Sequence, residues 1–114
     1  MTNHILERDV QRAVLALLHI HPKVSFAFRQ NSGQMQRGDR KVRFAFKGCS
    51  DVLGMLTDGR FLAVEIKRPG GKPTPAQQAF IDNVNRHGGL GLVVSSVQEI
   101  DEALKKPSMR VILH

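Results

Sequence analysis

Tryptophan and tyrosine are absent from this sequence of 114 residues, and cysteine occurs only once, at Cys49. A single cysteine excludes an internal disulfide and a zinc site built from several cysteines, and it suits a reducing compartment. The six phenylalanines fall in apolar patterns, so no aromatic ladder for stacking single-stranded nucleic acid is evident.

Long apolar runs are missing too. Residues 1–22 carry charges at Glu7, Arg8, Asp9 and Arg12, so they contain neither the apolar stretch of a signal peptide nor a membrane span of about 20 apolar residues. Hydrophobic residues make up 41% of the chain, enough for a modest core. We therefore expect a single soluble cytoplasmic domain, residues 1–114, with no membrane partner.

Acidic residues are scarce: ten Asp and Glu stand against seventeen Lys and Arg, which gives a net charge of +7. So much positive charge on a small domain favours a polyanionic partner. The basic residues are spread along the chain, and no basic amphipathic helix with bulky apolar anchors is evident. Nucleic acid is therefore a better candidate than a membrane surface, although a merely basic protein remains an alternative.

Apolar residues at helical spacing predict a first helix that Pro22 ends. Residues 23–29 alternate and predict a strand, residues 30–41 have the composition of a long loop, and residues 42–47 alternate again and predict a strand with a basic face. The apolar stripe of the first helix, with Glu7 at its rim, is expected to comprise Leu6, Val10, Ala13, Val14, Leu17 and Ile20.

The clearest hairpin joins residues 51–56 to residues 60–67. A two-residue turn would place Asp51 opposite Ile66, on the wrong face for Glu65. A three-residue turn with Gly59 in the left-handed conformation instead places Asp51 opposite Glu65. We predict the three-residue form.

The second half of the chain alternates helices and strands. Thr74 and Gln77 form a capping box for a helix that begins at Pro75 and ends near His87. Further elements are expected as a strand over residues 90–94, a helix over 97–105 and a strand over 109–113. A helix and several strands, followed by a helix, a strand, a helix and a strand, predict an α/β fold with a mixed central sheet flanked by helices.

Three polar residues occupy positions where a core sheet should have none. Asp51 begins one strand of the hairpin, and Glu65 and Lys67 share one face at the end of the other. Neighbouring carboxylates repel, and Mg²⁺ relieves this because it takes one or two carboxylate ligands and keeps several waters. The Lys67 ammonium could orient a metal-bound water or stabilise charge on a phosphate. The bare spacing alone also fits a surface salt bridge.

With Ser50-Asp51 and Glu65-Ile66-Lys67, the chain resembles the PD-(D/E)XK nuclease superfamily. Glu7 on the first helix and Gln77 on a later one make it similar to the VRR-NUC family, in particular its small stand-alone phage and bacterial members. The resemblance implies a restriction-endonuclease-like core and a bacterial or phage-infected cell. Ser50 stands where the superfamily name has proline, a position that supplies no ligand.

The resemblance also implies the roles of individual residues. Mg²⁺ or Mn²⁺ would be bound by Glu7, Asp51, Glu65 and the backbone carbonyl of Ile66. The catalytic set would be Asp51, Glu65, Lys67 and Gln77, although the capping box explains Gln77 equally well.

By the same resemblance, the chain is expected to be a metal-dependent DNA endonuclease that cuts branched DNA such as a four-way junction. Symmetric cleavage needs two sites, which a homodimer supplies through residues 43–46 or the last helix. A flap or restriction-like nuclease and a non-catalytic basic DNA-binding module remain alternatives. The expected phosphate contacts, which could also be a solvated basic face, are Arg29, Arg37, Arg40, Lys41, Arg43, Lys47, Arg68 and Lys72.

Overall fold

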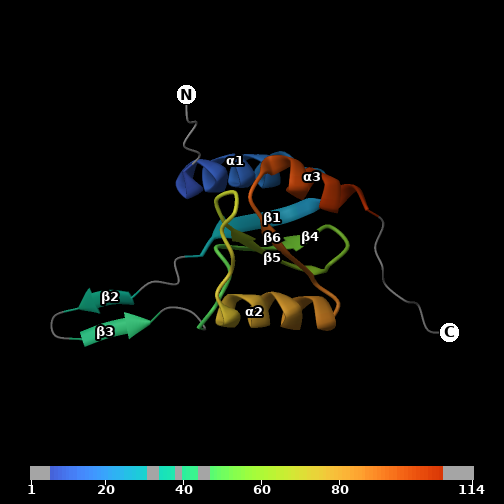
Figure 1. Cartoon of the computed structure of the whole chain (residues 1–114). Helices are drawn as coiled ribbons and strands as arrows, with labels where there is room; N and C mark the ends of the chain where they lie inside the picture. The colour runs from blue at the N-terminus through green and yellow to red at the C-terminus, as the bar shows by residue number, and fades with distance from the viewer. Residues whose placement is uncertain (1–5, 31–33, 38–39, 44–46, 107–114) are drawn as a thin grey trace, which may run out of the picture.

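A four-stranded sheet lies between helices α1 and α3 on one face and α2 on the other (Figure 1). The computed structural model describes residues 6–30, 34–37, 40–43 and 47–106. Strand order is β1-β4-β5-β6; β1, β4 and β5 are antiparallel, and β6 is parallel to β5. The elements are α1 (Glu7–Ile20), β1 (Val24–Arg29), β2 (Gln34–Arg37), β3 (Arg40–Arg43), β4 (Val52–Leu56), β5 (Phe61–Ile66), α2 (Pro75–Arg86), β6 (Leu90–Val94) and α3 (Val97–Lys105).

This arrangement confirms the predicted α/β class, a mixed sheet flanked by helices that is consistent with a restriction-endonuclease-like core. The helices α2 and α3 and the strand β6 lie where the sequence predicts them. The expected last strand, residues 109–113, lies outside the described residues.

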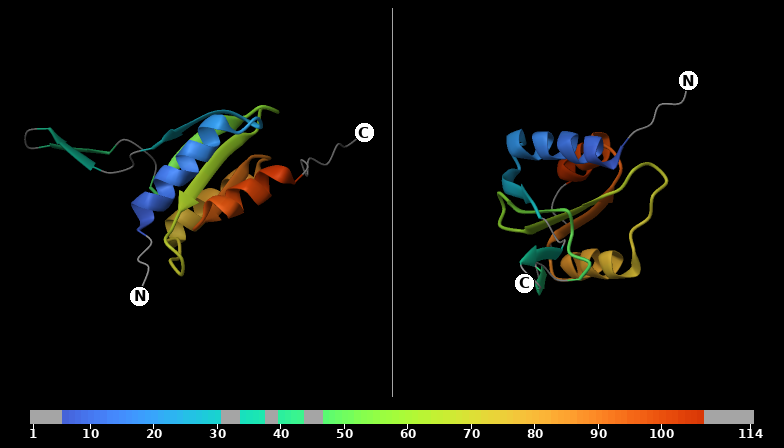
Figure 2. Two further views of the ribbon diagram at one scale, coloured as in Figure 1. Left: turned by 90° about the horizontal axis from the view of Figure 1, so that it is seen from above. Right: turned by 90° about the vertical axis from the view of Figure 1, so that its left-hand side faces the viewer.

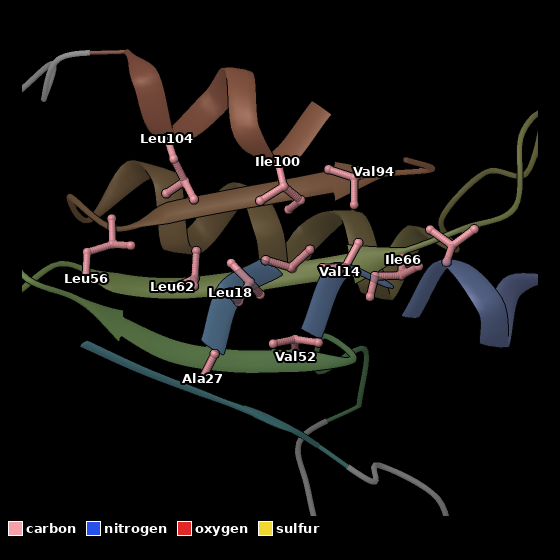
Figure 3. Close-up of a cluster of buried hydrophobic side chains, with 12 residues drawn as sticks. Val14, Leu18, Ala27, Val52, Leu56, Leu62, Ile66, Val94, Ile100 and Leu104 are labelled. Carbon is pink, nitrogen blue, oxygen red and sulfur yellow. The ribbon is translucent and has the colours of Figure 1, made fainter. Parts of the chain in front are cut away.

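The main core lies between the sheet and the α1–α3 layer, as Figure 3 shows. Val14, Val52, Leu62 and Ile100 are fully buried there. A smaller cluster, formed by Ala63, Ile81 and Val84, lies under α2. The two faces of the sheet are therefore covered unequally.

The buried stripe of α1 differs from the predicted one. Val10, Val14 and Leu18 are buried at a spacing of four residues, whereas Leu6 and Ile20 are exposed. Leu6 is the N-cap and has extended backbone. Ile20 lies two residues beyond the buried Leu18, which is about 200° around the helix, so it falls on the side away from the core.

A register shift in β1 breaks the alternation predicted for residues 23–29, which would place Val24, Phe26 and Phe28 on one face. Val24 pairs with Leu56 but Phe26 pairs with Met55, so the strand carries a bulge between Val24 and Phe26. Val24 and Ala27 consequently pack against the main core, while Phe26 and Phe28 are exposed on the other face of the sheet.

The predicted loop over residues 30–41 is wrong in part, because β2 and β3 form a separate antiparallel ribbon in which Arg37 pairs with Arg40 and Gln34 with Arg43. The sequences QMQR and RKVR are mostly polar, so they lack the apolar alternation that marks a half-buried strand. Figures 1 and 2 show the ribbon extending away from the main sheet. Of the predicted strand over 42–47, residues 44–46 lie outside the described part of the chain.

The β4–β5 hairpin has the predicted register. Val52 pairs with Val64 and Met55 with Phe61, and the backbone N–H of Leu56 donates to the carbonyl of Arg60 at 2.9 Å. Gly59 has φ 91°, the left-handed conformation that a three-residue turn requires. Asp51 and Glu65 therefore lie opposite each other, one step beyond the Val52–Val64 pair.

Candidate active site

Two carboxylates meet at one end of the β4–β5 hairpin. The Glu65 side chain projects from β5 and is almost completely buried, with 1% of the residue exposed. Asp51 precedes β4, and its Oδ2 accepts a hydrogen bond of 2.8 Å from the backbone N–H of Ile66. This bond ties the Asp51 side chain across the strand pair toward Glu65.

One oxygen of Glu65 is unsatisfied: Oε2 is buried and has no hydrogen-bond partner among the described residues. Burial raises the pKa of Glu65 to about 8; hydrogen bonding and repulsion from Asp51 contribute, while Lys67 opposes the shift. At neutral pH the pair therefore holds a proton in place of a second negative charge. A cation bound at this position would displace that proton.

Lys67 lies on the same side as the acidic pair. Its Nζ is 3.8 Å from Oε1 of Glu65, and its backbone N–H donates to the carbonyl of Val94 at 2.8 Å. This backbone bond extends the β5–β6 ladder by one residue beyond Ile66. The ladder fixes the ammonium beside the carboxylates, as the alternation of the strand predicts.

Glu7 is not held against the Asp51–Glu65 pair. It is the first residue of α1 and is exposed, and its charge contributes weakly to the raised pKa of Glu65. Within the described ranges, no group of three or more His, Cys, Asp or Glu side chains is close enough to hold a metal. The structure thus brings together Asp51, Glu65 and Lys67, and metal ligation by Glu7 stays a prediction.

Gln77 forms the capping box predicted for α2. Its Oε1 accepts from the backbone N–H of Thr74 at 2.8 Å, and the Thr74 hydroxyl accepts from the N–H of Gln77 at 3.2 Å. Gln77 also lines an open pocket of about 410 Å³ with Lys47 and Cys49. The cap is a sufficient structural reason for a glutamine here, and a catalytic role stays a prediction.

Gly48 lets the segment that leads to Asp51 pass close to helix α2, a role that the sequence pattern did not predict. Its φ is 80°, and a Cβ there would overlap the carbonyl oxygen of Ala76 at the start of α2. Only glycine lets the chain pass so close to the helix. A glycine three residues before the candidate ligand Asp51 was the feature of the sequence that could have indicated this role.

The two residues between Gly48 and Asp51 are buried. Burial raises the pKa of the Cys49 thiol. The carboxylates of Glu65 and Asp51 add to this rise, and the backbone N–H of Ser50 opposes it. The thiol therefore stays protonated and is a poor nucleophile. Nothing in the described residues explains the buried, unpartnered hydroxyl of Ser50.

The expected phosphate contacts fall into two groups. Arg29, Lys47, Arg68 and Lys72 are exposed, and Arg29 pairs with Val52, next to Asp51. The second group is placed by its backbone on the β2–β3 ribbon and comprises Arg37, Arg40, Lys41 and Arg43. DNA contact by either group stays a prediction.

The donor set fits a hard divalent cation. Two adjacent carboxylates and an unsatisfied buried oxygen offer the oxygen ligands that Mg²⁺ and Mn²⁺ prefer, and Mg²⁺ needs only one or two carboxylates because it keeps waters. Asp51, Glu65 and the carbonyl of Ile66 could hold such an ion.

Comparison with known proteins identifies a family. A family model described as the VRR-NUC domain matches residues 9–98. No curated protein and no solved structure matches the chain. In the part of the chain that the structure describes, none of the helices has the length and apolar character needed to cross a membrane.

Proposed function

Because the chain belongs to the VRR-NUC domain family and so has a nuclease-type function, we propose that it is a metal-dependent DNA endonuclease that hydrolyses phosphodiester bonds. The observation that carries the proposal is the buried Glu65 carboxylate, held opposite Asp51 with one oxygen unsatisfied and its pKa raised to about 8. A purely structural acid in a sheet would have both of its oxygens hydrogen-bonded or paired.

The residues divide the chemistry between them. Asp51, Glu65 and the Ile66 carbonyl, with Glu7, would hold Mg²⁺ or Mn²⁺, which when bound supplies Lewis-acid activation of the phosphate and of the attacking water. Lys67 would orient that water and balance the negative charge that develops on the phosphate oxygens. Asp51 is held in place by the N–H of Ile66. Gln77 would assist beside the site from the start of α2.

The substrate we propose is branched DNA, in particular a four-way junction, cut by a homodimer that supplies one site for each strand. The net charge of +7 and the four basic residues of the β2–β3 ribbon support a DNA substrate. A flap or restriction-like nuclease would use the same residues. A non-catalytic DNA-binding module would have no use for Lys67 beside the acidic pair.

The test is cleavage of a labelled panel that comprises a four-way junction, a flap, a splayed arm, a plain duplex and a single strand. Each is incubated with Mg²⁺, Mn²⁺ or EDTA. Lys67→Ala and Asp51→Ala should lose at least about 100-fold in rate, because electrostatic stabilisers of this kind contribute that much. Lys105→Ala, which changes an exposed lysine on α3, should cut like the wild type.

The outcomes separate the alternatives. Metal-dependent cuts at the junction that both site variants lose would support the proposal. Preference for a flap or for a defined sequence in plain duplex would replace junction resolution with the corresponding nuclease. Tight binding without cleavage under any metal would leave only the DNA-binding module.

A further inference from the structure

Ser50 carries a buried hydroxyl that makes no contact with a polar partner. The residue is 0% exposed, and its Oγ has no hydrogen-bond partner among the described residues. Such a hydroxyl destabilises a fold, and an alanine would fill nearly the same space without that cost. In the described part of the chain, the other side-chain atom in this state is Oε2 of Glu65, at the candidate metal site. The position of Ser50 next to Asp51 suggests that its hydroxyl serves the same site.

The Ser50 side chain belongs to the face of the sheet that α1 covers. The pairing of β1 with β4 continues one step before β4, because the N–H of Gln30 donates to the carbonyl of Asp51 at 2.6 Å. Side chains alternate along an extended segment, so Ser50 shares its face with Val52. Val52 lies in the main core beneath α1, together with Val14 (Figure 3). Ser50 is therefore the next residue on this face toward the end of the sheet.

Glu7 extends the buried stripe of α1 toward the same end of the sheet. It precedes Val14 by two helical turns, which places it about 20° from that residue around the helix. It is the first residue of α1, and α1 begins at the end of the sheet where β5 finishes (Figure 2). The residue is exposed, and its charge adds to the raised pKa of Glu65. Glu7 thus approaches the candidate site from the face that carries Ser50.

Other side chains are poorer partners for this hydroxyl. The carboxylates of Asp51 and Glu65 lie on the opposite face of the sheet, and neither of them bonds to it. Gln11 is half-buried in the next turn of α1, but it lies about 60° from the direction of Val14, at the rim of the stripe. A hydroxyl also bonds more strongly to a carboxylate than to a neutral amide. Glu7 is therefore the best acceptor.

We propose that Ser50 is a positioning residue for the predicted metal ligand Glu7, with its hydroxyl donating a hydrogen bond to the carboxylate that Glu7 turns toward a bound cation. This role rests on the proposed function for the cation, and it goes beyond it by assigning a residue that is not a ligand. Hydrogen bonds to the ligands of a metal orient them and raise metal affinity. The N–H of Ile66 already holds the Asp51 carboxylate in this way on the other face.

The proposed role makes stability and metal affinity change in opposite directions. Without a cation, the unpaired hydroxyl lowers the stability of the fold. With a cation, the same hydroxyl strengthens binding through Glu7. Ser50→Ala should therefore stabilise the protein in EDTA and weaken its binding of metal. A serine with a purely structural role would not produce both effects.

Binding of Mn²⁺ alone, followed by the electron paramagnetic resonance signal of the free ion, tests the proposal without DNA or cleavage. Ser50→Ala should weaken Mn²⁺ binding about tenfold, as the loss of a hydrogen bond to a metal ligand does. Asp51→Ala, which removes a ligand, should abolish binding and so shows that the ion occupies this site. The matched control is Ser25→Ala, which changes an exposed serine on β1 and should bind Mn²⁺ like the wild type.

A double-mutant cycle identifies the partner of the hydroxyl. Glu7→Ala should itself weaken Mn²⁺ binding, and adding Ser50→Ala to it should change the affinity by less than about twofold, because the acceptor is already gone. When Ser50→Ala is added to Gln11→Ala, the loss should be the same as in the wild-type background.

Thermal unfolding in EDTA gives the second readout. Ser50→Ala should raise the unfolding midpoint by at least about 3 °C, because it removes a buried hydroxyl that has no partner. Ser25→Ala, in which the lost hydroxyl is at the surface, should leave the midpoint unchanged.

The outcomes separate this proposal from the proposed function. Unchanged Mn²⁺ affinity in Ser50→Ala, or a lower unfolding midpoint in EDTA, would overturn the role of Ser50 and leave the nuclease standing. Independent losses from Ser50→Ala and Glu7→Ala would overturn Glu7 as the acceptor. A wild type that binds no Mn²⁺ would overturn the metal-dependent nuclease and the role of Ser50 with it. The expected cycle in a protein that cuts no DNA would support Ser50 and overturn the nuclease alone.

Discussion

The Glu65 carboxylate is buried in the β5 strand with one oxygen unpartnered, and Asp51 lies opposite. An ionised carboxylate in such a place is costly, so without a cation it keeps its proton up to a pKa of about 8. An unfolded chain would release that proton near the ordinary value of 4.5. The folded protein therefore binds more protons than the unfolded chain between these two pH values.

Stability of the metal-free protein should consequently fall as pH rises. The contribution of Glu65 is complete below about pH 4.5 and is lost progressively up to about pH 8, with a slope of at most about 1.4 kcal/mol per pH unit. Glu65→Gln stays neutral and should remove most of this slope, whereas the exposed Glu102→Gln should keep it. Urea denaturation in EDTA at pH 5, 6.5 and 8 measures the effect. A Glu65→Gln protein with the wild-type slope would contradict the assignment.

A single methyl group at Gly48 should disturb the site. Gly48→Ala places a Cβ against the Ala76 carbonyl at a φ of 80° and should cost at least about 2 kcal/mol in free energy of unfolding. Gly70→Ala is the matched control, because its φ is 84° but nothing lies within 4 Å of the added Cβ. It should cost about 1 kcal/mol.

Chemical denaturation of the two alanine variants compares these costs. Equal losses would show that backbone conformation alone, and not contact with α2, restricts Gly48.

Local pattern was enough to predict part of the site. Strand alternation places Glu65 and Lys67 on one face, and the turn length places Asp51 opposite Glu65, so these three follow from short-range rules. Glu7 depends on how a helix docks on the sheet, which periodicity does not specify. Gly48 depends on a contact with Ala76, twenty-eight residues away in the chain, and no local rule contains that contact.

Among the secondary-structure elements, α2 shows how one residue can serve two purposes. The capping box joins Thr74 and Gln77 in two reciprocal hydrogen bonds at the start of the helix. If Gln77 serves only as a cap, replacing Thr74 or Gln77 should have the same effect on cleavage. If Gln77 also acts at the site, the variant at Gln77 should lose more cleavage activity than the variant at Thr74.

Thr74→Ala and Gln77→Ala should each cost about 1 kcal/mol in free energy of unfolding, because either change breaks the cap. We expect Gln77→Ala to lose at least about tenfold more cleavage rate than Thr74→Ala, as a residue that also acts at the site would. Thermal unfolding and cleavage rates under single-turnover conditions give the two quantities. Equal rates at equal stability would reduce Gln77 to a cap.

Elements with strong apolar periodicity were predicted well, and those without it were not. The β4–β5 hairpin, α2, β6 and α3 match because their patterns and turn residues agree with their final surroundings. The ribbon was missed because its strands are polar. The bulge in β1 was missed because alternation is unbroken in sequence and the extra residue becomes visible only against the partner strand.

For the whole molecule, the net charge of +7 comes from basic residues spread along the chain, and four of them lie on the β2–β3 ribbon that extends from the sheet (Figure 2). Replacing Arg37, Arg40 and Arg43 by serine should weaken DNA binding and reduce the slope of log K against log salt by up to about 3 for three phosphate contacts.

The matched control for this change removes the same charge from Arg86, Lys105 and Lys106, at the ends of α2 and α3. Fluorescence anisotropy over a series of salt concentrations in EDTA measures both proteins. The same change of slope in both would mean that charge acts at long range and that the ribbon has no special role.

The ribbon also leaves and rejoins the sheet at neighbouring positions. Arg29 pairs directly with Val52, and the N–H of Gln30 donates to the carbonyl of Asp51 at 2.6 Å, so the strand pair β1–β4 closes without any help from the residues between. We expect such an inserted segment to tolerate changes in length and sequence while the main sheet keeps its structure. Relatives of this chain would therefore be able to differ in this insert without any change at Asp51, Glu65 or Lys67.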